Sequence, residues 1–346
     1  MIRSVTPRFL SCARLANSFE RLLTVSCKCL TTPKGETTMN VFDRKAKRIQ
    51  RDRTALLPDY KVYEYIKEEF GYRLADRVLD VKREFDILVD LGCGRGYVSK
   101  HLLKDTVKTI YQCELSEKML LQSEVSQEVP THRIVMDEEF LPFKDESLDI
   151  VVSSLSLHWV NDLPGCFRQV HNALKKDGVF LGCLFGGDTL FELRVSLQLA
   201  EQEKEGVSKL VDSSGLMGYY IDEIFSTHNK ELMYDLKGMA ENNCAWSRKN
   251  FLRRSTIERA DEIYKEMYGN DKGVPATFQV IYFIGWRPHP SQPKPAQRGS
   301  GQISFKDLEN LDQITQKLKD EDLDKLKSTS SDSGENSDTK EDPKKS

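Results

Sequence analysis

A strand that runs directly into a glycine-rich turn constrains this chain more than any other feature. Residues 87–96 read Ile-Leu-Val-Asp-Leu-Gly-Cys-Gly-Arg-Gly. The apolar run at the start is typical of a parallel strand that is covered on both faces. Gly92, Gly94 and Gly96 alternate with larger residues, and glycine allows the backbone to turn sharply and a ligand to come close. The stretch therefore predicts a ligand-binding turn at the carboxyl end of a strand, with a helix over 97–103 after it.

Strand and helix patterns alternate along the rest of the chain. The predicted strands cover 109–113, 132–136, 148–155, 179–185 and 277–286, and the predicted helices cover 60–78, 163–174, 232–239 and 256–267. Such alternation predicts an α/β fold with a parallel sheet and helices on both of its faces. Residues 277–286 are rich in apolar and aromatic side chains, and they are the candidate for a last, antiparallel strand.

Acidic residues stand at the ends of two predicted strands. Glu114 lies about 20 residues past the glycine turn, where a carboxylate can accept hydrogen bonds from ribose hydroxyls. Asp137 and Glu138 follow the next strand, where they can accept from an exocyclic amine. Because parallel sheets bind ligands at the carboxyl ends of their strands, these groups suit an adenosine. The turn has no phosphate-binding lysine, which favours a nucleoside with a charged non-phosphate tail over NAD or ATP.

Charge and reactive side chains narrow the class of partner. The net charge of −3 gives no bulk attraction to nucleic acid, so no nucleic-acid partner is predicted. The eight cysteines form no C-x-x-C pair, which favours reduced thiols in the core over a zinc site or a disulfide framework. The six histidines form no H-x-D or H-x-E pair of the kind found at non-heme iron sites, so no metal site is predicted.

The ends of the chain differ in composition from its centre. Residues 1–38 are basic, rich in serine and threonine and poor in acids, which predicts a mitochondrial transit peptide. The alternative is an ordinary disordered N-terminus. Residues 39–286 form the predicted folded domain, with a helical lead-in over 39–84. Prolines follow it, and residues 287–346 are predicted to be a mostly disordered tail.

A basic segment, Val41–Arg53, lies at the start of this lead-in. Its cations can contact an anionic membrane surface or an acidic partner. Such a run is more often a solvated face of a helix, and this is the interpretation that the sequence favours.

Several motifs resemble those of class I S-adenosylmethionine-dependent methyltransferases. They are Asp90–Gly96, Asp137–Phe143, Leu148–Ser154 and Leu174–Gly178, together with Glu114. The resemblance implies a Rossmann-like, mostly parallel sheet with a final antiparallel strand, and S-adenosyl-L-methionine as the cofactor. By position, the glycines would line the amino-acid end of the cofactor, which Asp90 would orient, while Glu114 would hold the ribose. The cofactor-binding residues expected from it are Asp90, Gly92, Cys93, Gly94, Gly96, Glu114, Leu115, Asp137 and Glu138.

A longer resemblance covers most of Asn40–Asp307. The residues that carry it are 40–44, 153–163, 185–194, 242–246 and 274–277. They are similar to the family of mitochondrial complex I assembly factors of methyltransferase fold, described as protein-arginine hydroxylases. The resemblance implies that the chain hydroxylates an arginine on a core subunit of respiratory complex I. It also implies peripheral association with the mitochondrial inner membrane, on the matrix side. Between Glu205 and Ile221 the chain is shorter than the family pattern and lacks a Ser/Pro-rich loop.

The residues themselves leave the reaction open among three classes. The motifs imply methyl transfer to a protein or small molecule, the longer resemblance implies hydroxylation, and a non-catalytic assembly chaperone is the third possibility. His158 and Trp159 follow the fourth strand, and Asp188 follows the fifth. These three are the candidate catalytic residues, with Asp188 suited to bind a guanidinium by a charge-assisted bond and Trp159 suited to stack on it. The alternative for Trp159 is ordinary packing in the core.

Overall fold

A computed structural model describes residues 23–24, 40–205, 221–226, 229–248, 251–271 and 273–292. The chain divides into two compact units, Met1–Ser291 and Gln292–Ser346, and every described helix and strand lies in the first. The predicted transit peptide lies outside the described residues except for a two-residue strand, β1 (Leu23–Thr24). The predicted disordered tail beyond residue 292 and most of the shortened segment after Glu205 also lie outside them.

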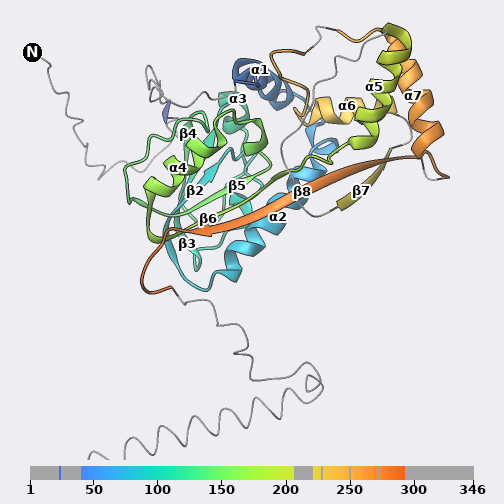
Figure 1. Cartoon of the computed structure of the whole chain (residues 1–346). Coiled ribbons are helices and arrows are strands. Elements are labelled where there is room, and N and C mark those ends of the chain that lie inside the picture. Colours follow the sequence, from blue (N-terminus) through green and yellow to red (C-terminus); the bar gives the residue numbers. More distant parts are fainter. Residues whose placement is uncertain are drawn as a thin grey trace, which may run out of the picture. The chain divides into compact units, whose positions relative to one another are not determined.

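Eight described strands form one sheet in the order β1-β4-β3-β2-β5-β6-β8-β7 (Figure 1). After β1 these are β2 (Phe85–Leu91), β3 (Val107–Glu114), β4 (Thr131–Val135), β5 (Leu148–Ser154), β6 (Leu174–Phe185), β7 (Ile221–Ser226) and β8 (Val274–Trp286). The strands from β1 to β6 pair in parallel, and β8 pairs antiparallel with both β6 and β7. The predicted α/β fold, with its final antiparallel strand, is confirmed.

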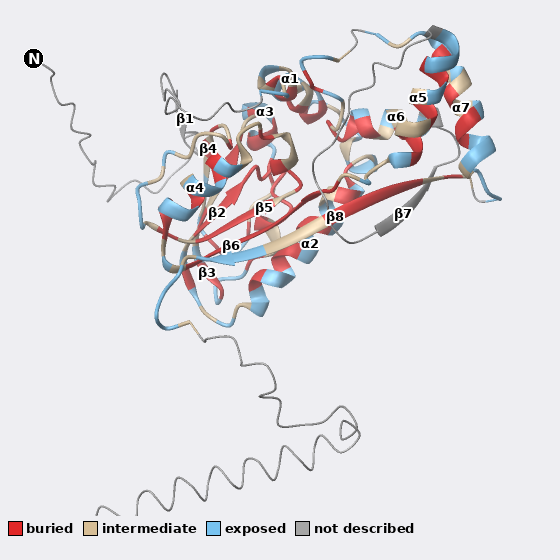
Figure 2. Ribbon diagram, viewed as in Figure 1, coloured by how far each residue is buried: buried red, intermediate tan, exposed pale blue. Residues whose placement is uncertain are grey.

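The helices cover both faces of this sheet. They are α1 (Arg44–Ala55), α2 (Tyr65–Asp80), α3 (Glu117–Leu121), α4 (Leu163–Ala173), α5 (Phe191–Glu205), α6 (Asn229–Gly238) and α7 (Arg254–Tyr268). Side chains from α2, α5 and α7 pack on one face in a large apolar core, and side chains from α4 pack on the other face in a second core. Figure 2 shows the resulting buried strands between the helices, whose outer surfaces are exposed.

Strand alternation explains why two cores form. In β2, Leu88 belongs to the core under α2 and its neighbour Val89 belongs to the core under α4. In β5, Ile150 and Val151 divide in the same way. Successive side chains on a strand point to opposite faces, so a continuous apolar run requires cover on both sides. The sequence interpretation of residues 87–91 is therefore confirmed.

The segment after the glycine turn differs from its prediction. Instead of an α-helix over 97–103, it contains one 3-10 turn, η2 (Ser99–His101). Leu102 already has an extended backbone, with ψ of 137°, and ends the turn. Val98 and Leu102 are buried, and this places the chain tightly before it enters β3. The spacing of Val98 and Leu102 therefore arises from the burial of these two side chains in a short connection, and not from an α-helix.

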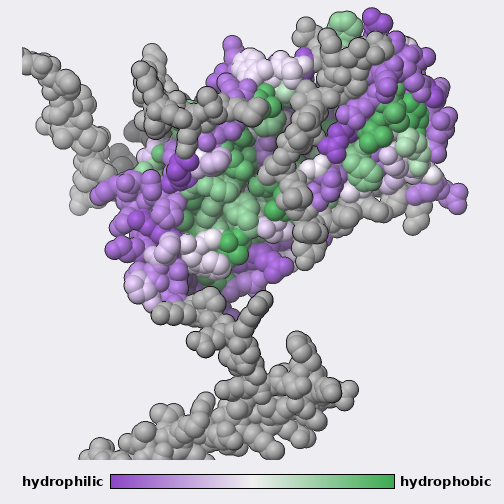
Figure 3. All heavy atoms as spheres, viewed as in Figure 1, coloured by the Kyte–Doolittle hydropathy of each residue, from purple (hydrophilic) through white to green (hydrophobic). Residues whose placement is uncertain are grey.

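The face of the sheet that carries α4 has an apolar area over its middle (Figure 3). Phe167 on α4 packs against Phe180 and Phe283 of the strands beneath it, with ring centroids 5.3 and 5.7 Å away.

The described cysteines Cys93, Cys113, Cys166, Cys183 and Cys244 are free and buried. None of the described helices is long and apolar enough to span a membrane.

Replacing Gly96 with alanine is expected to cost about 3 kcal/mol or more of unfolding free energy. Gly96 has φ of +81°, and a Cβ there would overlap the backbone carbonyl oxygen of Glu124. Gly94→Ala is the matched control, because Gly94 also has a positive φ, +55°, but its added Cβ would meet no atom closer than 4.0 Å. The control should lose only about 1 kcal/mol. Equal losses in urea titrations of the two variants would contradict this account.

Candidate functional site

The glycine turn joins the carboxyl ends of β2 and β3. Gly92, Gly94 and Gly96 all have positive φ angles, 71°, 55° and 81°. The backbone N–H groups of Gly92 and Cys93 donate to the carbonyl of Cys113, over 2.8 and 2.9 Å. The Gly94 N–H donates to the Glu114 carboxylate over 3.1 Å. The predicted glycine turn at the end of β2 is confirmed, and it contacts the Glu114 carboxylate through Gly94. Ligand binding by the turn stays a prediction.

Helix α1 covers this turn with cations. Asp43 caps the helix by accepting from the Ala46 N–H at 3.0 Å. Lys47 and Arg51 lie on its inward face and are 0% and 6% exposed. The favoured interpretation of Val41–Arg53 as a solvated face holds for its outer cations, Lys45, Arg48 and Arg53, which are exposed. It is wrong for the inward face, where Arg51 pairs with buried carboxylates and Lys47 donates to backbone carbonyls.

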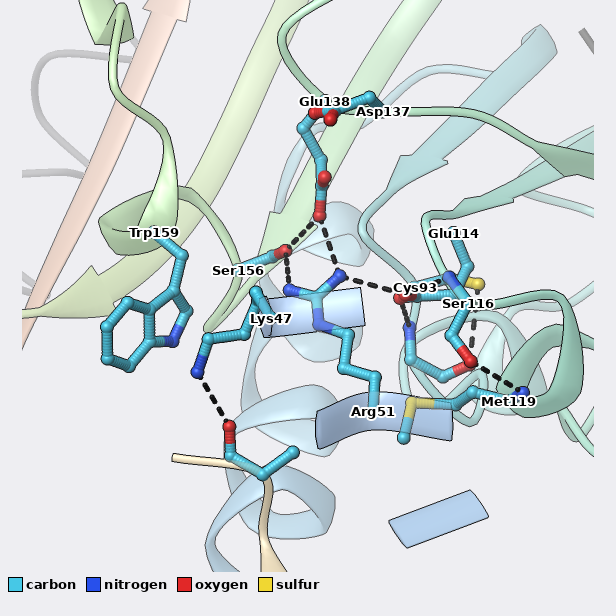
Figure 4. Close-up of polar contacts among 12 residues, drawn as sticks. Lys47, Arg51, Cys93, Glu114, Ser116, Met119, Asp137, Glu138, Ser156 and Trp159 are labelled. Atoms are coloured by element: carbon cyan, nitrogen blue, oxygen red, sulfur yellow. Dashed lines mark hydrogen bonds and ion pairs between the residues drawn. The ribbon is translucent and has the colours of Figure 1, made fainter. Parts of the chain in front are cut away.

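Arg51 lies inside the acidic site (Figure 4). One guanidinium nitrogen, Nη1, donates to Glu114 at 2.8 Å and to Glu138 at 2.9 Å. The other, Nη2, donates to the hydroxyl of Ser156 at 2.9 Å. Ser156 in turn donates to Glu138 at 2.6 Å. The two carboxylates that the sequence assigns to a nucleoside therefore hold a guanidinium of this chain.

Arg44 makes a second guanidinium contact at the outer rim. Its guanidinium pairs with Asp137 at 2.8 Å, with Glu138, and with the backbone carbonyl of Trp159 at 3.1 Å. Burial opposes the ionisation of Glu138, but the charges of Arg44 and Arg51 outweigh it and lower the pKa of the carboxyl well below its usual range. Glu138 is thus an ionised carboxylate shared by two arginines.

His158 and Trp159 do come together, around a residue that the sequence did not indicate. The Glu241 carboxylate accepts from Trp159 Nε1 at 2.7 Å and lies 3.2 Å from His158 Nε2. Lys67 pairs with the same carboxylate at 3.1 Å. No spacing in the sequence relates Glu241 to these partners; its position next to the 242–246 motif was the one available signal.

Lys47 lies against this cluster. Its Nζ is 3.4 Å from the centroid of the Trp159 ring and donates to the carbonyls of Ala240 and Asn242 at 2.8 and 3.2 Å (Figure 4). Burial lowers the pKa of Lys47 to about 7. Burial likewise lowers the pKa of His158. Trp159 thus packs beneath a buried amine, and it is a neighbour of the acidic site.

Asp188 has a different environment. Its carboxylate accepts from Gln279 Nε2 at 3.1 Å, and its backbone N–H donates to the Gln279 side chain at 3.0 Å. The hydrogen bonds of the described residues join His158 and Trp159 through Glu241 but do not include Asp188 in that cluster. Its role as a guanidinium-binding residue stays a prediction.

Some features of the turn fit a nucleoside with an amino-acid tail. Asp90 is fully buried, and its Oδ2 accepts from Ser99 at 2.6 Å while its Oδ1 has no hydrogen-bond partner. A Cβ added at Gly94 would meet only the Met119 sulfur, at 4.0 Å. Cys93 is buried in the turn, and Leu115 lies half-buried directly after Glu114. An unpartnered carboxylate oxygen is the kind of acceptor that a ligand ammonium would satisfy.

The cavity in the site is too small for such a ligand. The cavity between the turn and α1 is about 30 Å³, whereas ligand sites usually have about 300 Å³ or more. It is lined by Arg51, Lys67, Gly94 and Glu114, among others. The guanidinium of Arg51 is paired with Glu114, the residue to which the resemblance assigns the ribose. S-adenosylmethionine therefore does not fit this arrangement of α1, although the residues around the turn have the chemistry to bind it.

Known proteins share this sequence over most of its length. A methyltransferase domain family model matches residues 89–182. The mitochondrial arginine-hydroxylase NDUFAF5 of Danio rerio is 48% identical over 295 residues, 80% of this chain and 92% of that protein. The Homo sapiens protein of the same name is 48% identical over 82% of this chain and 88% of its own length.

Among solved structures, phosphoethanolamine N-methyltransferase 2 of Haemonchus contortus, in complex with S-adenosyl-L-methionine, is 17% identical. The match covers 70% of this chain and 60% of that one, with a TM-score of 0.40. The identity and coverage of the NDUFAF5 relatives show the family of this chain. The chain belongs to the family of arginine-hydroxylase NDUFAF5 proteins.

Proposed function

We propose that this chain is a mitochondrial enzyme that hydroxylates an arginine on a core subunit of respiratory complex I, as part of complex I assembly. The observation that carries the proposal is the 48% identity to a relative named as a mitochondrial arginine-hydroxylase. The match covers 92% of the length of that relative. The site of action in the proposal is the matrix side of the inner membrane, with peripheral membrane association. The transit-peptide composition of residues 1–38 supports the mitochondrial location.

The acidic site supports arginine as the group that is recognised. Glu114, Glu138 and Ser156 already bury one guanidinium, and Asp137 with Glu138 holds a second. Charge-assisted bonds to a planar guanidinium combine strength with defined geometry. The carboxyl ends of β3, β4 and β5 therefore provide an environment that accepts arginine side chains.

The proposal includes S-adenosyl-L-methionine as a ligand of the glycine turn. Its support is the methyltransferase domain match over residues 89–182 and the unpartnered Asp90 oxygen beside the turn. Binding requires a different position of α1 from the one described. The methyltransferase match also supports a second candidate function, methyl transfer from this cofactor to the same class of substrate.

The mass of the substrate distinguishes these functions. The purified protein is added to a matrix extract from cells that lack it, with the arginine-bearing subunit and with or without added S-adenosylmethionine. The extract supplies the reductant, because insertion of one oxygen atom from dioxygen leaves the second atom to be reduced to water by two electrons. Hydroxylation is expected to add one oxygen atom to one arginine-containing peptide.

A subunit in which that arginine is replaced by lysine is the control, and it should gain nothing. A gain of one methylene unit in place of oxygen would establish methyl transfer and contradict the main proposal. A subunit that binds the protein stably but keeps its mass would contradict both enzymatic functions and indicate an assembly chaperone.

A further inference from the structure

The inward face of α1 is held by charge and not by an apolar stripe. Arg44, Lys47 and Arg51 recur at the spacing of one helix face and point toward carboxylates and backbone carbonyls. Burying ion pairs carries a large desolvation cost, so such docking adds less net stability than apolar packing of similar area. A helix docked in this way is released more easily once its acidic partners find another ligand.

The Glu114 carboxylate already accepts three hydrogen bonds. Its Oε1 accepts from Arg51 at 2.8 Å and from the Ser116 N–H at 3.0 Å, and its Oε2 accepts from the Gly94 N–H at 3.1 Å. The carboxylate is fully buried. A ribose diol that binds it from the cavity side would need the space of the Arg51 guanidinium. The two groups therefore exclude each other.

Further contacts fasten α1 over the turn. Asp52 accepts from the Ser116 hydroxyl at 2.6 Å, which joins α1 to the N-terminus of α3. Arg95 of the glycine turn donates to the backbone carbonyls of Thr54 and Ala55 at 3.0 and 3.3 Å. The end of α1 is thus tied to the loop that a ligand would contact. A movement of α1 would therefore break hydrogen bonds to Arg95 of the glycine turn.

We propose that α1 is a lid and that the Arg51 guanidinium competes with the ribose of the adenosine cofactor for Glu114. The inference rests on the proposed cofactor. In the closed arrangement Arg51 neutralises the acidic site and α1 fills its space. Cofactor binding displaces Arg51, and α1 leaves the turn. The affinity for the cofactor is then reduced by the free energy that holds the lid closed.

A reversible cross-link tests the lid. Asp52→Cys together with Ser116→Cys places two thiols where the side chains now touch, so oxidation should fasten α1 to α3. The probe is S-adenosylhomocysteine, and its binding is measured by calorimetry. We expect binding to the reduced protein and at least a tenfold weaker affinity, or none, for the oxidised protein. Equal affinities in the two redox states would overturn the lid.

Arg51→Met tests the competition directly. The variant removes the guanidinium but keeps an unbranched side chain, and it should bind S-adenosylhomocysteine roughly tenfold more tightly than the wild-type protein. Arg48→Met is the matched control, because Arg48 lies on the same helix with its side chain exposed. It should change the affinity by less than about twofold. Unchanged affinity in a folded Arg51→Met protein would overturn the competition.

Hydrogen exchange of the wild-type protein needs no variant. S-adenosylhomocysteine is expected to increase exchange at the amides of residues 44–55, because the lid is released. Slower exchange there on binding would overturn the inference and leave the cofactor proposal intact. Absence of binding to the wild-type protein and to Arg51→Met alike would overturn the cofactor proposal, and the inference with it.

Discussion

Replacing Asp90 with asparagine is expected to raise the free energy of unfolding by about 4 kcal/mol at pH 8. Burial raises the pKa of Asp90 to about 7, and the nearby charge of Glu114 adds to the effect. The asparagine removes a buried charge and keeps an acceptor for Ser99. Its amide NH2 takes the position of the oxygen that already has no partner, so one unpartnered polar group replaces another and the charge is removed.

The gain must depend on pH in a defined direction. The ordinary pKa of an aspartate is 3.8 and the folded value is about 7, so the folded protein binds the proton more tightly. Asp90 therefore lowers stability progressively as pH rises from about 4 to 7. The benefit of asparagine should be small at pH 4 and complete above pH 7.

Denaturant titrations of Asp90→Asn at pH 5 and pH 8 measure this difference. Asp86→Asn is the control, because Asp86 lies on the same strand, is exposed and pairs with Lys108 at 2.8 Å. Its hydrogen bond to Lys108 lowers its pKa, so its replacement should give no stabilisation at either pH. A loss of stability on replacing Asp90 at pH 8 would show that its charge is favourable in the folded protein. Because Asp90 directly precedes the glycine turn and accepts from Ser99 just after it, stabilisation is also expected to accompany weaker ligand binding.

Glu138→Ala is expected to lower the free energy of unfolding by about 3–5 kcal/mol. Glu138 is the carboxylate that Arg44 and Arg51 share, and it also accepts from Ser156. Its removal leaves two largely buried guanidinium groups with fewer partners. Thermal or denaturant unfolding at pH 7 measures the loss.

Glu146→Ala provides the control for a carboxylate at the surface. Glu146 also pairs with an arginine, Arg287, at 2.6 Å, but half of its side chain is exposed. Its loss should cost less than about 1 kcal/mol. Adding Arg51→Leu to Glu138→Leu should not restore the lost stability, because it leaves the fully buried Glu114 carboxylate without its cation. A double variant as stable as the wild-type protein would show that the buried charges do not cause the loss.

The strand segments and the glycine turn could be predicted because their signals are local. A continuous apolar strand such as Leu88–Leu91 requires cover on both faces wherever it lies. The positive φ angles of Gly92 and Gly94 follow from the same residues that marked the turn. These features depend on neighbours in the sequence and on general packing rules.

The occupancy of the site could not be predicted, because it depends on pairs far apart in the chain. Arginine and glutamate usually lie at the surface, and nothing in the sequence near Arg51 or Glu114 indicates that the two meet in the interior. Burial of Lys47 against the Trp159 ring likewise depends on a distant segment, the loop around Glu241, whose carbonyls accept from the Lys47 amine. A basic helix with this spacing is as compatible with a solvated face as with a buried one, and the distribution of acids on other elements decides between them.

Strand β8 has a consequence for how ligands reach the site. Its residues 280–286 pair with β6, and residues 274–279 pair with β7. Helices α5 and α7 pack on the same strand and on each other (Figure 1). One uninterrupted strand thus pairs with both β6 and β7. These two strands cannot move apart without breaking backbone hydrogen bonds of β8. A movement that admits a ligand to the glycine turn is therefore expected from α1, which lines the cavity through Arg51, and not from separation of β6 and β7.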